Sequence, residues 1–272
     1  MYRLVAIDLD GTLLNSQSKI SERNRQAIGR AIEKGVEVVI CSGRILSGAK
    51  VFAREVGAEG IIITCNGAII SDVKTGAVLY DNPMSKEDCY KIIDVCRKEK
   101  VYFHVYTGNV MFTEELKYGA LFYWNINESL PRDERIDIRM VEDIGEAVRK
   151  FHKSASKFVV ISEDRAQLLR IRKQVACIDT VEVMSSNYNN IEVVNRGVSK
   201  GSALKFISEK LGIPREEVIA IGDNENDYSM IQFAGLGVAM GNAENFVKEA
   251  ADYVTLSNDE DGVAEVFKKF VL

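Results

Sequence analysis

Two aspartates separated by one residue give the sharpest chemical signal in the chain, in the segment Asp8-Leu9-Asp10-Gly11-Thr12. On an extended chain residues i and i+2 point the same way, so Asp8 and Asp10 would face one ligand. Two carboxylates so close must be separated by a cation or share a proton. One could attack phosphorus and form an aspartyl-phosphate, while the other transfers protons. The alternative is a solvated turn, since Asp-Gly is a common turn signal.

Three further polar sites fit the same chemistry. Ser42-Gly43 offers a hydroxyl and a backbone N–H to an anion. Asp223 is the first polar group after an apolar run, as a metal ligand would be, although ordinary helix capping is the alternative. Lys200 opens a predicted helix, where the macrodipole disfavours cations. A cation there is easier to explain if it neutralises an anion, and a solvated lysine is the alternative.

The elements that must position these residues are short apolar runs that alternate with amphipathic stretches. Runs of strand length cover residues 4–7, 36–40, 61–63 and 218–221. Continuous apolar strands with crossover helices predict an α/β fold with a doubly wound, Rossmann-like parallel sheet. Asp8, Ser42, Asn66 and Asp223 each follow one of these strands, and such sheets bind ligands in the crevice outside the strand ends. The result is an oxygen-rich site suited to Mg²⁺ and phosphate.

The middle of the chain differs from the rest in composition and pattern. It contains both histidines, the single tryptophan and strand-like segments at 101–106, 136–141 and 158–161. We interpret residues 83–190 as an inserted α+β domain. Residues 1–82 and 191–272 would then form the catalytic core.

Composition excludes several classes of protein. The 272 residues carry a net charge of −5, and only two are histidines, so His-rich zinc sites and His-dependent triads are improbable. Five cysteines without a CxxC pair predict reduced thiols and a cytoplasmic location. The chain has no apolar run of the roughly 18 residues that a membrane span requires, no P-loop motif and no basic stripe. We expect no membrane or nucleic-acid partner.

Together these motifs resemble the haloacid dehalogenase superfamily, and specifically its Cof-type phosphatases. The resemblance covers essentially the whole chain. It rests on DLDGT at 8–12 with its preceding strand, SGR at 42–44, NGA at 66–68, SKG at 199–201 and GDNENDYSM at 222–230. Their order and spacing match, as does the long insertion, which would act as a large α/β cap that closes over the core.

The resemblance implies a role for each motif residue. Asp8 would be the nucleophile and a Mg²⁺ ligand, Asp10 the general acid/base and a ligand through its carbonyl, and Asp223 the third ligand. The phosphoryl group would be held by Ser42, Gly43, Lys200 and Asn226, with the Leu9 backbone. Supporting roles would fall to Asp227, Thr12 and Asn66.

The sequence thus predicts a cytoplasmic, Mg²⁺-dependent phosphomonoesterase that acts on a small-molecule phosphate ester, as a monomer or small homo-oligomer. Sugar phosphates and phosphorylated cofactors are the expected substrates. One alternative is a phosphotransferase or phosphomutase on the same core, which would pass the phosphoryl group to a second hydroxyl. Another is a phospho-accepting regulatory module without turnover, which would need neither Asp10 as acid/base nor a cap.

Overall fold

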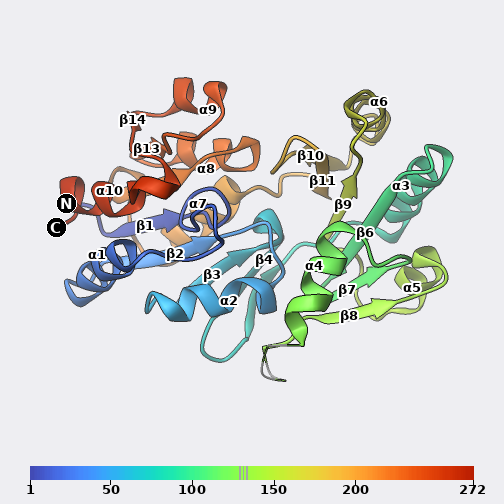
Figure 1. The fold of residues 1–272 in the computed structure, drawn as a ribbon, viewed down its shortest axis with the longest axis horizontal. Helices are drawn as coiled ribbons and strands as arrows, with labels where there is room; N and C mark the ends of the chain where they lie inside the picture. The colour runs from blue at the N-terminus through green and yellow to red at the C-terminus, as the bar shows by residue number, and fades with distance from the viewer. Residues whose placement is uncertain (129, 131, 133) are drawn as a thin grey trace.

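Two β-sheets, each with its own helices, make up the chain in the computed structural model, which describes residues 1–128, 130, 132 and 134–272 (Figure 1). The first sheet has eight strands in the order β14-β13-β12-β1-β2-β3-β4-β5. Its strands are β1 (Leu4–Ile7), β2 (Glu37–Cys41), β3 (Ile61–Thr64), β4 (Ile69–Asp72), β5 (Val78–Asp81), β12 (Val218–Gly222), β13 (Leu236–Ala239) and β14 (Tyr253–Val254). All neighbours pair in parallel except β3–β4 and β4–β5, which are antiparallel.

Helices cover both faces of this sheet because its central strands are apolar on both sides. Alternate residues of β1 belong to two separate hydrophobic clusters. Helices on one face are α1 (Glu22–Glu33), α2 (Leu46–Glu55), α9 (Asn245–Ala250) and α10 (Gly262–Phe270), and on the other α7 (Lys200–Lys210) and α8 (Tyr228–Phe233). This doubly wound arrangement confirms the predicted fold class, and we call the first sheet with its helices the core.

The second sheet has six strands in the order β10-β11-β9-β6-β7-β8, antiparallel except for the β7–β8 pair. Its strands are β6 (Tyr102–Thr107), β7 (Val110–Thr113), β8 (Asp137–Met140), β9 (Lys157–Ile161), β10 (Val181–Met184) and β11 (Asn190–Asn195). The remaining α-helices are α3 (Lys86–Lys98), α4 (Tyr118–Asn127), α5 (Ile144–Lys150) and α6 (Arg165–Val175). We call this sheet with α3 to α6 the cap, drawn in green to olive in Figure 1.

The two faces of the cap sheet pack against different partners. One face packs on α3, α5 and α6. Residues of the opposite face, among them Tyr106 and Val159, share a hydrophobic cluster with α4 and with the core residues Ile45, Cys65 and Ala68. The side chains of the cap sheet therefore reach the edge of the core at which the parallel strands end.

The chain passes between core and cap twice, once after β5 and once after β11. The two crossing segments lie side by side, because Asn195 Nδ2 donates a hydrogen bond of 2.7 Å to Asn82 Oδ1. Short 3-10 turns complete the fold at Cys65–Gly67, Arg215–Glu217, Glu225–Asp227 and Asn258–Glu260. A search of the described residues finds no helix with the length and apolar character needed to span a membrane.

Candidate active site

Four neighbouring parallel strands deliver polar residues to one edge of the core sheet. Asp8 follows β1, Ser42 follows β2, and Asp223 follows β12, while Asn66 lies in the turn after β3. These strands are adjacent in the order β12-β1-β2-β3, so the sheet itself brings the four side chains together. Each of the four residues is buried, with at most 8% of its surface exposed.

Lys200 joins the first and last motifs of the chain. It is fully buried, and its Nζ donates hydrogen bonds to Asp8 Oδ1 at 2.5 Å and to Asp227 Oδ1 at 2.6 Å. The helix α7 begins at this residue, with Ser199 as its N-cap. Burial alone would lower the pKa of Lys200, but the carboxylates of Asp227 and Asp8 raise it well above its ordinary value. Lys200 therefore stays an ammonium inside the protein.

The turn after β12 is organised around Asp227. Its Oδ2 accepts hydrogen bonds from the backbone N–H groups of Asp223, at 3.0 Å, and Asn224, at 3.1 Å. Asp223 in turn accepts a hydrogen bond of 2.9 Å from the Thr12 hydroxyl. Gly11 makes this approach possible, because a Cβ there would lie 2.4 Å from Asp223 Oδ2 and its φ of +82° favours glycine.

The buried carboxylates carry more negative charge than the protein around them neutralises. Oxygen atoms of Asp8, Asp223 and Asp227 lie within 4.8 Å of one another, and Lys200 contributes one positive charge. Burial and the neighbouring Asp227 charge raise the pKa of Asp223 to about 7, and burial with the same neighbour raises the pKa of Asp8 well above its ordinary value. An oxygen-lined site with excess negative charge fits a hard divalent cation such as Mg²⁺.

Asp10 faces the same cavity as Asp8 but is held by a residue to which the sequence analysis gave no role. Arg44 Nε and Nη2 donate to the two carboxylate oxygens of Asp10 at 2.8 and 2.5 Å. The guanidinium also lies over the Phe52 ring, 5.1 Å from its centroid. Arg44 is the third residue of the SGR motif, so its position beside Ser42 and Gly43 was the available signal.

The predicted phosphate-binding residues converge next to Asp8. Asn226 Nδ2 donates a hydrogen bond of 3.2 Å to Asn66 Oδ1, and the Asn66 N–H donates one of 3.1 Å to the Ser42 carbonyl. Gly43 sits so close to this group that a Cβ on it would lie 2.8 Å from Asn66 Oδ1. Leu9 buries its side chain in the core while its carbonyl accepts hydrogen bonds within the turn that follows β1.

Cys41, directly before Ser42, is buried and has no role in this arrangement. Burial raises the pKa of its thiol well above the ordinary value, so the reactive thiolate is disfavoured.

A buried ion pair from the cap reaches into this group and was not predicted from the sequence. Lys157 Nζ lies 2.8 Å from Glu192 Oε1, and the two side chains are only 2% and 5% exposed. Lys157 also donates a hydrogen bond of 2.5 Å to the Gly43 carbonyl, and Glu192 accepts one of 2.6 Å from Asn66 Nδ2. The cap is therefore hydrogen-bonded directly to the residues that surround Asp8.

Core and cap together line a cavity of about 280 Å³. The core side carries Asp8, Asp10, Gly43, Arg44, Asn224 and Asn226. The cap side includes the rings of His104, Tyr106 and Tyr123, with Val159 and Ile161 between polar residues. A small molecule in this cavity would contact both carboxylates of the DLD segment and a partly aromatic, partly apolar wall.

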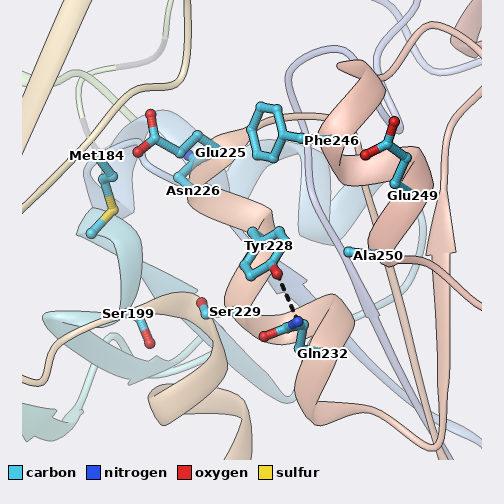
Figure 2. Close-up of a pocket in the computed structure, with 10 residues that line it drawn as sticks. All are labelled: Met184, Ser199, Glu225, Asn226, Tyr228, Ser229, Gln232, Phe246, Glu249 and Ala250. Carbon is cyan, nitrogen blue, oxygen red and sulfur yellow. Dashed lines mark hydrogen bonds between the residues drawn. The ribbon is translucent and has the colours of Figure 1, made fainter.

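A wider cavity of about 710 Å³ lies on the other side of the Glu225-Asn226 turn (Figure 2). Figure 2 shows Glu225 beside Met184 at one end, and Phe246 with Glu249 at the other. Neither Asp8 nor Asp10 lines it, and the described residues that line it include no lysine or arginine that could hold a phosphate. The smaller cavity is thus the candidate site for an anionic substrate.

Comparisons with known proteins match nearly the whole chain. The family model described as haloacid dehalogenase-like hydrolase matches residues 5–267. The chain is 35% identical to the 5-amino-6-(5-phospho-D-ribitylamino)uracil phosphatase YcsE of Bacillus subtilis, over 99% of this chain and 96% of the relative. It is 30% identical to the pyridoxal phosphate phosphatase YbhA of Escherichia coli, over 97% and 96%. A solved haloacid dehalogenase-like hydrolase from B. subtilis has a TM-score of 0.88 and 31% identity, over 98% and 99%.

Proposed function

The chain belongs to the haloacid dehalogenase-like hydrolases, and on that premise we propose that it is a Mg²⁺-dependent phosphomonoesterase that works through an aspartyl-phosphate on Asp8. The observation that carries the proposal is the position of Asp8. This buried carboxylate lines the cavity between core and cap, hydrogen-bonded to the ammonium of Lys200 and accompanied by Asp10. A nucleophile, a proton carrier and a fixed positive charge are the groups that phosphoryl transfer requires.

The carboxylates of Asp8 and Asp223 would hold Mg²⁺, with the backbone carbonyl of Asp10 as the third protein ligand. Asp227 would support the site by orienting the backbone of the Asp223 turn and by holding Lys200. Thr12 would fix the Asp223 carboxylate through its hydroxyl. When bound, the cation supplies positive charge that neutralises the phosphoryl oxygens and the carboxylates around them.

Different residues of the chain would carry out the steps of the reaction. Ser42, Gly43, Asn226 and Lys200 orient the phosphoryl group, with the Leu9 backbone. A carboxylate oxygen of Asp8 attacks phosphorus, and the bond from phosphorus to the ester oxygen breaks. Asp10, once released from Arg44 and protonated from solvent, gives this proton to the departing alkoxide.

The second half of the reaction regenerates the enzyme. Asp10 takes a proton from a water molecule, whose oxygen attacks the phosphorus of the aspartyl-phosphate. The bond to Asp8 breaks, and inorganic phosphate and free Asp8 result. The charge on phosphorus oxygens is balanced throughout by fixed groups, so positioning and electrostatics provide most of the catalysis.

Small phosphorylated metabolites, either sugar phosphates or phosphorylated cofactors, are the proposed substrates. The cavity of about 280 Å³ has room for a compact molecule, and the cap forms one wall of it, so that closure over a substrate would exclude water. Two relatives are named for a ribityl-uracil phosphate and for pyridoxal phosphate, which are molecules of this size class. We place the enzyme in the cytoplasm, since four of its five cysteines are buried as free thiols.

Phosphate release from p-nitrophenyl phosphate, with and without Mg²⁺, tests the proposal. We expect Mg²⁺-dependent release, and we expect Asp8→Asn to lower kcat by about a thousandfold or more because it removes the nucleophile. Asp94→Asn, on the exposed side of α3, is the matched control and should leave kcat unchanged. Circular dichroism would verify that both variants are folded.

Two results would contradict the mechanism. Activity that survives in a folded Asp8→Asn variant would mean that Asp8 is not the nucleophile. Phosphorylation of an added sugar, in place of phosphate release, would instead identify a phosphotransferase.

A further inference from the structure

We call the cavity of about 280 Å³ that Asp8 and Asp10 line the catalytic cavity. Another cavity, of about 410 Å³, which we call the second cavity, lies between core and cap and shares no lining residue with it. Its core walls come from α2, β4 and the turn between β4 and β5. Its cap walls come from the β6–β7 turn and from residues 151–153, so any occupant would contact both halves of the molecule.

The lining of this cavity is cationic. Lys50, Arg54, Lys74 and Lys153 all belong to it, and among the described residues that line it there is no aspartate or glutamate. This contrasts with the net charge of −5 on the whole chain. Four basic residues from two halves of the protein around one hollow would attract an anion.

Three of these basic residues form ion pairs with acidic residues outside the lining, and Lys153 donates a hydrogen bond of 3.0 Å to Asp81 Oδ2. Lys74 lies 3.4 Å from Glu59, and Arg54 lies 3.9 Å from Glu134. The side chains of the three pairs are between 23% and 67% exposed, and partly exposed pairs of this kind contribute little. An anion inside the cavity would therefore compete with these partly exposed partners and not with a fully buried ion pair.

Two buried hydroxyl groups belong to the same lining. Ser71 on β4 and Thr107 at the end of β6 have no exposed surface, and their hydroxyl oxygens have no hydrogen-bond partner within the part of the chain that the structure describes. A buried polar group without a partner is costly. One hydroxyl comes from the core and the other from the cap, and each is an unused donor beside the cavity.

The rest of the wall is apolar, with Leu46, Val73, Val78 and Phe151. We propose that this cavity is a second binding site, for a small organic anion that carries a phosphate or carboxylate group. The anionic group would lie among the basic residues and accept hydrogen bonds from Ser71 and Thr107, and the carbon skeleton would lie against the apolar residues. The proposal does not depend on the catalytic activity.

Nuclear magnetic resonance can separate this site from the catalytic one, because each contains glycines whose amide signals report on it. Gly76 and Gly108 line the second cavity, whereas Gly43 lines the catalytic cavity and Gly11 lies beside Asp223. Inorganic phosphate and citrate would be titrated separately into the ¹⁵N-labelled, Mg²⁺-saturated protein. We expect at least one of them to shift the Gly76 and Gly108 signals in a saturable manner, and which one does so distinguishes a phosphate from a carboxylate ligand.

Two variants tie the shifts to the cavity. Arg54→Gln combined with Lys74→Gln should raise the apparent Kd at Gly76 and Gly108 by about tenfold or more, because it removes two of the charges that hold the anion. Ser71→Ala combined with Thr107→Val tests the hydroxyls with little change in volume and should also weaken binding. Lys205→Gln, on the exposed side of α7, is the matched control and should leave the Kd unchanged.

The proposal would be overturned if both anions shift only Gly11 and Gly43, or if the signals of Gly76 and Gly108 drift without saturation. It would also be overturned if the Arg54/Lys74 variant binds as the Lys205 variant does. Failure of the proposed phosphatase activity would leave all of these measurements interpretable, since they need no turnover.

Discussion

His104 is a buried histidine in a row of rings on the cap face that lines the catalytic cavity. Its ring centroid lies 5.8 Å from that of Tyr102 and 5.3 Å from that of Tyr106. Burial, together with the positive charge of Lys157, lowers the pKa of His104 to about 3. The imidazole is therefore neutral near pH 7 and adds no charge to a site that already contains several charged side chains.

This residue should make the stability of the protein depend on pH in a defined window. The unfolded chain takes up a proton at His104 near pH 6.5, whereas the folded protein does so only near pH 3. Between these values a fall in pH favours the unfolded state, by up to about 1.4 kcal/mol per pH unit from this residue. We expect the free energy of unfolding to fall from pH 7 to pH 5 more steeply in the wild type than in His104→Gln.

Urea denaturation at both pH values measures the difference. His152→Gln is the matched control because His152 is the other histidine of the chain and is exposed. We expect the unfolding free energy of this variant to change with pH as that of the wild type does. Equal pH dependence in the wild type and His104→Gln would contradict the prediction.

At the level of the elements, the ion pair between Lys157 on β9 and Glu192 on β11 connects the cap sheet to the loops of the core. Lys157 and Glu192 stand on the face of these strands that looks toward the core, and each makes one hydrogen bond to a core residue, Gly43 or Asn66. The interaction is buried at both ends. Its contribution is therefore specific to the closed arrangement of cap on core, and it orients residues that we propose to bind phosphate.

Removing one partner of this pair should be costly. We expect Lys157→Met to destabilise the protein by about 3–5 kcal/mol, because it leaves the Glu192 carboxylate buried without its counter-charge. The double variant Lys157→Met/Glu192→Leu should lose less unfolding free energy than the two single variants together. Lys150→Met, which removes an exposed i,i+4 pair with Glu146, should cost about 0.5 kcal/mol or less.

Thermal and urea unfolding give these values, and the KM for p-nitrophenyl phosphate gives a second readout. If the pair orients the phosphate-binding loop, KM rises in Lys157→Met under conditions where the variant is fully folded. If the double variant loses as much unfolding free energy as the two single variants together, and KM is unchanged, Lys157 and Glu192 act independently.

The sequence predicted the strands that end in the candidate site, because each is a continuous apolar run followed by a polar residue. The runs at 4–7 and 218–221 match β1 and β12 to within one residue. The strand β5 (Val78–Asp81) was not predicted, since its position at the edge of the sheet leaves two of its residues exposed and so without an apolar pattern.

The same reasoning explains which site residues the sequence could indicate. Asp8, Asp10 and Asp223 stand in short motifs whose local pattern is chemically unusual. Lys157 and Glu192 are single charged residues in apolar strands, 35 positions apart. Each is locally odd, but only the pairing of β9 with β11 brings them together, and that pairing has no local signature.

For the molecule as a whole, the excess of buried carboxylates should make stability depend on a divalent cation. Asp8, Asp223 and Asp227 share one lysine, so a bound cation would relieve their repulsion. A ligand that binds the folded state alone stabilises it by about 2.7 kcal/mol at a concentration one hundred times its Kd. We expect Mg²⁺ to raise the melting temperature and EDTA to reverse this rise.

Asp223→Asn should abolish most of the Mg²⁺-induced shift while it raises the stability of the metal-free protein, because it removes one of the repelling charges. Asp252→Asn, which leaves the buried cluster intact, is the control and should keep the shift. The interpretation of the cluster as a cation site would be wrong if Mg²⁺ stabilised wild type and Asp223→Asn equally.

The two crossings between core and cap lie side by side, joined by the hydrogen bond between Asn82 and Asn195. In topological terms the cap is one long loop whose ends leave and re-enter the core at almost the same point. Such a loop can be exchanged for another without changing the strand order that holds Asp8, Ser42 and Asp223. Evolution could therefore replace the cap wall of the cavity while keeping the core residues beneath it, and if the cap selects the substrate, as we propose, a chimera joined at Asn82 and Asn195 would carry the preferences of whichever parent donated the loop.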